Sequence, residues 1–258
     1  MQLSLCYTDL NNSSIKSVVR WMPLKGHMEY ISVEGRSCIC FVPDGAVRHL
    51  AVLCGWNMEN LMPALSEELA ETLLISVPAD GSRDFTPWPA PAVWENEPFY
   101  GEGQAYRQYL TESVLPRIFE KFGFIPAEDR LIAGYSLGGL FALWAACETK
   151  CFGLAASLSG SVWYPGFIEY VRENPPAKQT KLYFSLGDRE PFGGPPALRK
   201  VGVCTEALHA FLQEEGFETM LEWNRGGHGK GIENRWRKAL RWAARYWKGS
   251  GHETANII

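Results

Sequence analysis

The chain has 258 residues, of which 46% are hydrophobic and 21% are charged, as is typical of a soluble globular protein. A chain of this length buries a large core without cross-links, which excludes a disulfide mini-protein, a collagen and a coiled coil. The net charge of −4 provides no basic surface for nucleic acid, and no apolar run is long enough to span a membrane. We predict one domain over residues 1–258, with no nucleic-acid or membrane partner.

The cysteines and the N-terminal residues indicate a cytoplasmic protein. Residues 1–14 lack the basic start and the apolar stretch of a signal peptide. The seven cysteines form no close-spaced framework, which indicates reduced thiols. No set of histidines, cysteines and acids has metal-site spacing, and no phosphate-loop or dinucleotide motif is present. We therefore expect neither a metal nor a cofactor, and no pattern indicates an oligomeric state.

Short apolar runs alternate along the chain with longer segments of helical periodicity. The runs predict strands at 30–33, 37–42, 49–53, 73–77, 131–134, 155–159, 181–187 and 220–224. Helical periodicity follows most of the later runs, at 106–118, 140–147 and 236–247. Continuous apolar strands are covered on both faces, which predicts an α/β fold with a mostly parallel sheet and helices on both sides. The early runs are joined by short turns and predict an antiparallel start to this sheet.

Two segments between these elements have a distinctive composition. Residues 80–103 are rich in proline, glycine and aromatic residues, and a loop of this length is usually functional. Four basic residues fall in the last helical stretch, and we expect them to form its solvated face. They are Arg235, Arg237, Lys238 and Arg241.

The sequence Gly134-Tyr135-Ser136-Leu137-Gly138 has the pattern G-x-S-x-G. Five letters alone are a weak signal, because a glycine-rich turn with a surface serine would match them too. Here the pattern follows an apolar strand and opens a helix, which is the setting of a nucleophile elbow. The amides at the start of that helix would face negative charge that forms beside the serine. Ser136 is therefore the candidate nucleophile.

A serine hydroxyl needs a base, and the base needs an orienting acid. His228 lies in a glycine-rich loop between the last strand and the last helix, in the chain order serine, acid, histidine. Two acids follow the strand at 181–187. The position of Glu190, a few residues beyond the strand, favours it as the acid, and Asp188 is the alternative.

A tetrahedral intermediate needs two amide donors. We expect one to be the amide of Leu137, directly after the candidate nucleophile, and the other to be the amide of Trp56, after the strand at 49–53. Arg83 and Arg189 are candidates for attracting an anionic substrate, and the alternative is that either pairs with Asp84 or Glu190. The remaining candidates for substrate contact are aromatic residues, which include Trp56 itself together with Trp88, Trp163 and Tyr164.

Several segments resemble the putative-esterase family of α/β-hydrolases, and the resemblance covers roughly residues 37–246. They are the elbow at 134–139, the segment RDFTPW at 83–88 and the turn GDREP at 187–191. The resemblance implies an α/β-hydrolase fold of about eight strands with little or no lid, and it favours Glu190 as the acid. The sequence departs from the family at Cys54, where relatives often carry an aspartate, which bears on the Trp56 assignment.

Members of this family include siderophore lactone esterases, feruloyl esterases and S-formylglutathione hydrolases. The resemblance therefore implies a serine esterase that forms an acyl-enzyme, needs no cofactor and acts on a small-molecule ester, such as a siderophore lactone or a sugar or phenolic ester. A thioesterase or acyltransferase of the same fold would use the same residues. A catalytically silent binding protein of the same fold is the remaining alternative.

Overall fold

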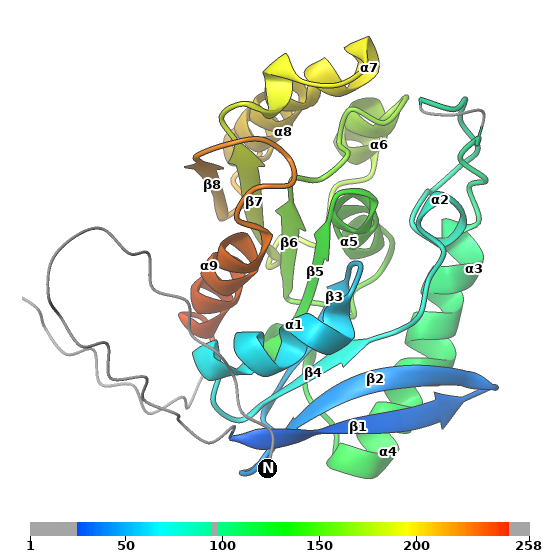
Figure 1. Cartoon of the computed structure of the whole chain (residues 1–258), viewed down its shortest axis with the longest axis vertical. Coiled ribbons are helices and arrows are strands. Elements are labelled where there is room, and N and C mark those ends of the chain that lie inside the picture. Colours follow the sequence, from blue (N-terminus) through cyan, green and yellow to red (C-terminus); the bar gives the residue numbers. More distant parts are fainter. Residues whose placement is uncertain (1–24, 94–96, 248–258) are drawn as a thin grey trace, which may run out of the picture.

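The computed structural model describes residues 25–93 and 97–247, and it is organised around one eight-stranded sheet (Figure 1). The strands are β1 Gly26–Val33, β2 Arg36–Pro43, β3 His49–Cys54, β4 Thr72–Ser76, β5 Arg130–Tyr135, β6 Leu154–Leu158, β7 Lys181–Gly187 and β8 Thr219–Asn224. Each of the eight predicted strands overlaps one of these, so the predicted strand pattern is confirmed.

The order of the strands across the sheet is β1-β2-β4-β3-β5-β6-β7-β8. The strands β1, β2 and β4 pair antiparallel, whereas all pairs from β4 to β8 are parallel. The predicted antiparallel start of a mostly parallel sheet is therefore confirmed. Because parallel strands end at the same edge, the residues that follow β3, β5, β7 and β8 meet there.

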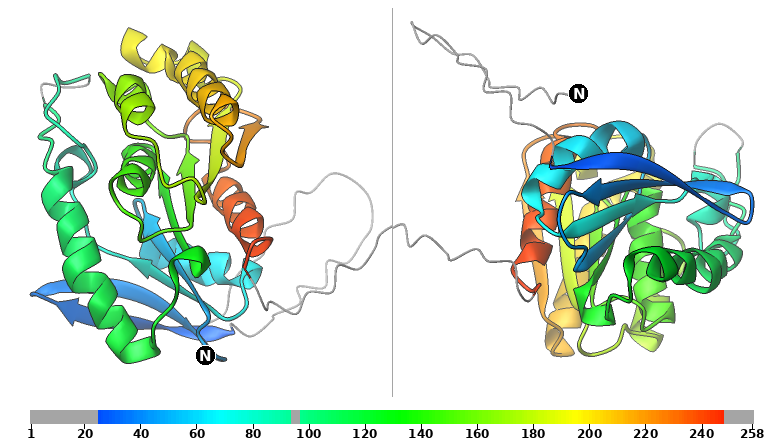
Figure 2. Two further views of the ribbon diagram at one scale, coloured as in Figure 1. Left: turned by 180° about the vertical axis from the view of Figure 1, so that it is seen from behind. Right: turned by 90° about the horizontal axis from the view of Figure 1, so that it is seen from below.

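Helices cover both faces of the sheet, as the buried apolar strands require (Figure 2). Apolar residues of α1 and α9 pack on one face. Those of α3, α4, α5, α6 and α8 pack on the other. The helices are α1 Met58–Leu65, α2 Gly81–Asp84, α3 Gly103–Gln108, α4 Leu115–Phe122, α5 Leu137–Glu148, α6 Phe167–Glu173, α7 Pro196–Arg199, α8 Val201–Glu214 and α9 Ile232–Ala244.

The helix predicted at 106–118 is present but is not uniform. Its α-helical ends, α3 and α4, flank a π-helical segment, Tyr109–Val114. This wider segment ends two residues before Pro116, which has no amide proton to donate to the carbonyl group of Glu112. The missing hydrogen bond accounts for the change in winding.

The aromatic segment at 80–103 packs into the molecule rather than standing free. Phe85 and Phe99 are buried, and Phe99 pairs with Ala90 in an isolated antiparallel bridge. Trp94 lies outside the described residues. Within 25–93 and 97–247, no helix has the length and apolarity needed to cross a membrane.

Candidate active site

Ser136 lies at the sharp turn between β5 and α5. Its backbone has φ 59° and ψ −120°, a conformation that residues other than glycine rarely adopt. A hydrogen bond of 3.0 Å from the Ser136 amide to the carbonyl oxygen of Leu158 on β6 holds the turn. The turn also depends on glycine, because a Cβ atom on Gly138 would lie 1.9 Å from the carbonyl oxygen of Cys54.

His228 contacts both the candidate nucleophile and a carboxylate. The Ser136 hydroxyl lies 3.1 Å from Nε2 of His228, and Nδ1 of His228 lies 2.8 Å from Oε2 of Glu190. With its proton on Nδ1, the imidazole donates to Glu190 and accepts the serine proton at Nε2. The structure therefore brings together three of the side chains singled out in the sequence, from the ends of β5, β7 and β8.

The two acids after β7 have different partners. Glu190 is 7% exposed and reaches His228, whereas Asp188 is exposed and its Oδ1 accepts the amide of Gly226 at 2.7 Å. The Asp188 amide also donates to the carbonyl oxygen of Asn224 at 2.8 Å. Asp188 thus ties the end of β7 to the loop that carries His228, and Glu190 is the acid that meets the imidazole.

Glu190 is stabilised as a carboxylate. Its Oε1 accepts hydrogen bonds from the Gly187 amide at 2.7 Å, the Ser159 hydroxyl at 2.8 Å and Nη1 of Arg235 at 2.6 Å. Burial raises the pKa of Glu190, but the hydrogen bonds from His228, Ser159 and Arg235 lower it by more, so the pKa lies below its ordinary value. The group is therefore ionised at neutral pH.

The expectation of a solvated Arg235 is wrong. This side chain is 1% exposed, and besides Glu190 it contacts Ser159, the Tyr135 hydroxyl at 3.1 Å and the Gly227 carbonyl oxygen at 2.9 Å. The sequence carries a signal for this, because Arg235 shares its face of α9 with the buried Ala239 and Trp242. The other basic residues of the cluster pair with surface acids, among them Glu67, Glu68 and Glu222.

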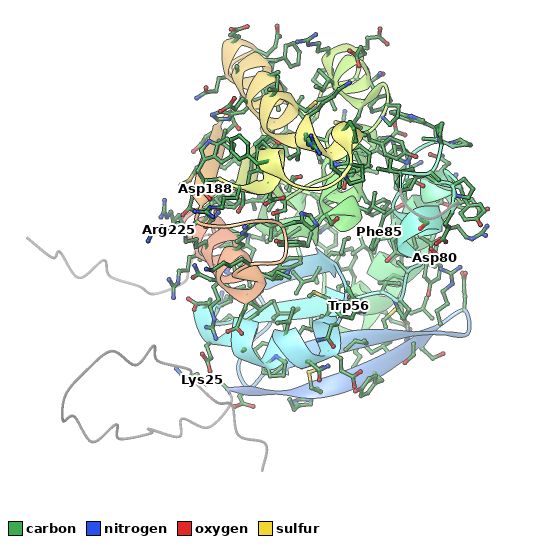
Figure 3. The ribbon with its side chains drawn as sticks, turned by 45° about the horizontal axis from the view of Figure 1, so that its top comes forward. Lys25, Trp56, Asp80, Phe85, Asp188 and Arg225 are labelled. Carbon is green, nitrogen blue, oxygen red and sulfur yellow. The ribbon has the colours of Figure 1, made fainter. Side chains whose placement is uncertain are left out.

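Two cavities meet at Ser136. The amide-side cavity, of about 560 Å³, is lined by Leu137 and Trp56 among others. The histidine-side cavity, of about 240 Å³, is lined by His228, Glu190, Arg189 and Trp163, together with Leu198 and Val201. Figure 3 looks toward this edge of the sheet, with Trp56 labelled after β3 and Asp188 after β7.

The predicted amide donors both lie at the amide-side cavity. Leu137 is the first residue of α5, so its amide has no acceptor within that helix. Trp56 lies in the turn between β3 and α1, and its side chain is 90% exposed. Both residues therefore share a cavity with Ser136.

The structure does not bring Arg83, Trp88 and Tyr164 to either cavity. Tyr164 is 2% exposed, and its hydroxyl donates to the Trp88 carbonyl oxygen at 2.6 Å. Arg83 pairs with Glu102 at 2.5 Å and stacks on the Tyr100 ring. These side chains have partners within the fold, whereas Trp56, Trp163 and Arg189 line the two cavities at Ser136.

No group of three or more His, Cys, Asp or Glu side chains in the described part of the chain is arranged to hold a metal ion. The side chains that the described residues bring together at this edge of the sheet are a hydroxyl, an imidazole and a carboxylate.

Solved structures with a similar fold carry esterase and hydrolase names. An IroE-like serine hydrolase from Shewanella oneidensis aligns with a TM-score of 0.69 and 15% identity, over 84% of this chain and 79% of its own. The siderophore hydrolase EstA from Aspergillus nidulans aligns with a TM-score of 0.65 and 18% identity, over 92% and 99%. The enterobactin esterase FES from Shigella flexneri aligns with a TM-score of 0.67 and 19% identity, over 87% of this chain and 60% of its own.

At these identities the solved structures show the fold, which is that of the α/β-hydrolases. No curated protein matches the chain in sequence. The model of the family described as "Putative esterase" matches residues 53–245, which is well over half of the chain. This protein therefore belongs to the putative esterase family and is an esterase.

Proposed function

We propose that the protein is a serine carboxylic ester hydrolase in which Ser136 is the nucleophile, His228 the general base and Glu190 the orienting acid. The observation that carries this proposal is the continuous hydrogen-bonded chain from the Ser136 hydroxyl through both nitrogens of His228 to Glu190. Such a chain is the geometry that activates a serine near neutral pH.

In the first half of the reaction, Oγ of Ser136 attacks the ester carbonyl carbon while its proton passes to Nε2 of His228. Glu190 stabilises the imidazolium that forms. When the tetrahedral intermediate collapses, the bond to the alcohol oxygen breaks, and His228 donates its proton to that oxygen. The products of this half are the free alcohol and an ester of Ser136.

In the second half, a water molecule attacks the acyl-enzyme and gives its proton to His228. The carboxylic acid leaves when the proton returns to Oγ of Ser136. In both halves, the negative charge on the carbonyl oxygen falls to the amides of Leu137 and Trp56. A single donor of this kind is typically worth about 100- to 1000-fold in rate.

For the substrate, we propose a small-molecule ester or lactone of the kind named for the siderophore hydrolase and the enterobactin esterase, or a sugar or phenolic ester. The two cavities at Ser136 supply room on both sides of a scissile bond. A panel of esters, lactones and thioesters, assayed with and without an acceptor alcohol, separates hydrolysis of oxygen esters from thioesterase and acyltransferase activity.

A fluorophosphonate probe tests the nucleophile directly, because it reacts with activated serines. We expect it to label the wild type and to leave Ser136→Ala unlabelled. Ser161→Ala is a matched control, since Ser161 lines the same histidine-side cavity but the hydrogen bonds of the His228 ring go to Ser136 and Glu190. We expect Ser161→Ala to be labelled. Labelling of Ser136→Ala would reject Ser136 as the nucleophile.

A further inference from the structure

The two cavities at Ser136 differ in which group of the reaction lines them. His228, which protonates the leaving oxygen in the proposed mechanism, lines the histidine-side cavity. The amides of Leu137 and Trp56, which receive the carbonyl oxygen, line the amide-side cavity. An ester bound across Ser136 therefore directs its alcohol half into the histidine-side cavity and its acyl half toward the amide-side cavity.

The cavities also differ in charge. Arg189 lines the histidine-side cavity, whereas the lining of the amide-side cavity includes Glu59 and no cation. The histidine-side lining also includes the Glu190 carboxylate, but that group is paired with Arg235, so Arg189 leaves this side with an unbalanced positive charge. Two further cations, Arg199 and Lys200, lie at the end of α7 close in sequence to the cavity residues, and Nε of Arg199 donates to the carbonyl oxygen of Gly194 at 3.1 Å.

The guanidinium of Arg189 forms no ion pair or hydrogen bond with any described residue. The neighbouring acids are already engaged, because Asp188 accepts the Gly226 amide and Glu190 accepts from His228 and Arg235. The backbone of Arg189 is nevertheless fixed, since its amide donates to the carbonyl oxygen of Gly226 at 3.2 Å. A cation on an anchored backbone, without a protein partner and lining a cavity, is available to an anion from solution.

We propose that the enzyme prefers esters whose alcohol half carries a carboxylate, and that Arg189 binds this carboxylate in the histidine-side cavity. The preference rests on the proposed function, because it assumes that His228 protonates the leaving alcohol. Trp163, Leu198 and Val201 supply apolar contact for the carbon skeleton between the carboxylate and the ester oxygen. The released product is then a hydroxycarboxylate.

Two pairs of substrates test this preference. The first pair is O-butanoyl lactate, which carries a negative charge on its alcohol half, and O-butanoyl lactamide, which carries none. The second pair is monoisopropyl succinate, which carries a negative charge on its acyl half, and isopropyl succinamate, which carries none. The measured quantity is the ratio of kcat/KM for the acid over the amide within each pair. Comparing that ratio between variants cancels differences in the intrinsic reactivity of the esters.

Relative to the wild type, we expect Arg189→Met to lower the kcat/KM ratio of the lactate pair by about tenfold, which corresponds to about 1.4 kcal/mol. The ratio of the succinate pair stays unchanged. Arg189→Lys keeps part of the preference, because it retains the charge without the planar fork. Arg225→Met is the matched control, because Arg225 is also exposed and close to Asp188 but does not line the cavity (Figure 3). It leaves both ratios as they are.

Salt provides a second readout. At about 1 M salt the Debye length is about 3 Å, so the wild-type preference for the lactate ester weakens if the Arg189 charge causes it. A lactate ratio that is equal in the wild type and in Arg189→Met, or that salt does not change, overturns the proposal. Turnover that survives in Ser136→Ala would instead overturn the proposed function, so the two failures are distinguishable.

Discussion

At the scale of single residues, the candidate site is a row of charged and polar side chains, each of which contacts the next. Arg235 contacts Glu190, Glu190 contacts His228, and the imidazole of His228 contacts Ser136. In the proposed mechanism His228 takes up the serine proton, and the buried carboxylate already has Arg235 as a cation beside it. The buried pair therefore fixes the position of Glu190 as well as its charge.

Removing the cation of this pair should be costly. We predict that Arg235→Met lowers the free energy of unfolding by about 3 kcal/mol, because it leaves the buried carboxylate of Glu190 without its ionic partner. Urea denaturation measures the change. Arg225→Met, which removes an exposed arginine, serves as the control and should change stability by less than about 0.5 kcal/mol. Equal stability of Arg235→Met and the wild type would show that the pair contributes nothing.

The two acids after β7 can be separated by isosteric replacements. We predict that Glu190→Gln lowers kcat by about 10⁴-fold, as the loss of an orienting acid does in other triads. Asp188→Asn keeps an oxygen that can accept the Gly226 amide, so we expect it to lower kcat by less than about tenfold. Steady-state kinetics on one ester give both values. The opposite order of effects would assign the orienting role to Asp188.

Sequence reasoning reached these residues unevenly. Ser136 and His228 follow from local patterns, namely a strand–turn–helix motif and a glycine-rich loop before the last helix. The choice between Glu190 and Asp188 depends on how the turn after β7 winds, and a short 3₁₀ turn at Glu190–Phe192 brings Glu190 inward. The burial of Arg235 depends on which face of α9 meets the sheet. Single-sequence patterns report such tertiary placement only weakly.

At the scale of elements, strands were easier to predict than short helices. The strands are buried apolar runs, whereas α1, α6 and α7 have eight, seven and four residues, which is too short for a clear helical period. The helix α1 also contains Pro63, which interrupts the pattern further. The π-helical segment before α4 has no periodicity of its own, so only the structure reveals it.

The packing of the elbow against β3 gives a prediction at this scale. We expect Gly138→Ala to lower the free energy of unfolding by about 3 kcal/mol and to abolish ester turnover, because its Cβ would lie 1.9 Å from the Cys54 carbonyl oxygen. Gly45→Ala is the control, since a Cβ there meets no atom within 4 Å. Thermal or urea unfolding and an ester assay supply the two readouts. A Gly138→Ala protein with wild-type stability would show that α5 moves freely away from β3.

At the scale of the whole molecule, acids that pair with α9 couple stability to pH. Hydrogen bonds from Arg241 and Arg237 lower the pKa of Glu68 despite the opposing effect of burial, and Lys238 does the same for Glu222. These acids join the segments after α1 and along β8 to α9. A carboxyl group whose pKa is lower in the folded than in the unfolded chain stabilises the fold above its unfolded pKa.

The pKa of these glutamates in the unfolded chain is 4.5. We therefore predict that their whole contribution to the free energy of unfolding is present above pH 4.5 and is lost as the pH falls through their lower pKa values in the folded chain. Asp84, whose pKa is raised by burial, opposes this trend but is one group against several. Urea titrations at a series of pH values between 7 and 3 measure the slope. Stability that rises as the pH falls below 4.5 would contradict the assignment.

Composition and charge predicted a globular protein but do not determine its domain boundaries. The single domain over residues 1–258 and the cytoplasmic location stay predictions, since composition reports them only indirectly. The two cavities lay beyond sequence reasoning, because their walls come from segments far apart in the chain, such as Trp163 and Leu198. Side chains of Arg83, Trp88 and Tyr164 were grouped with the site by proximity in sequence motifs, and their actual contacts depend on how the segment at 80–103 folds back.

The loop that carries His228 is anchored at three points: Asp188 holds the Gly226 amide, Arg235 holds the Gly227 carbonyl oxygen, and the Tyr135 hydroxyl donates to the carbonyl oxygen of His228 itself. The imidazole is thus preorganised before any ester arrives. Turnover then requires no gating motion of this loop, and crystals soaked with a phosphonate inhibitor should superimpose on the ligand-free form here. In the proposed mechanism, an imidazole held in this way is already in position for proton transfer when the ester binds.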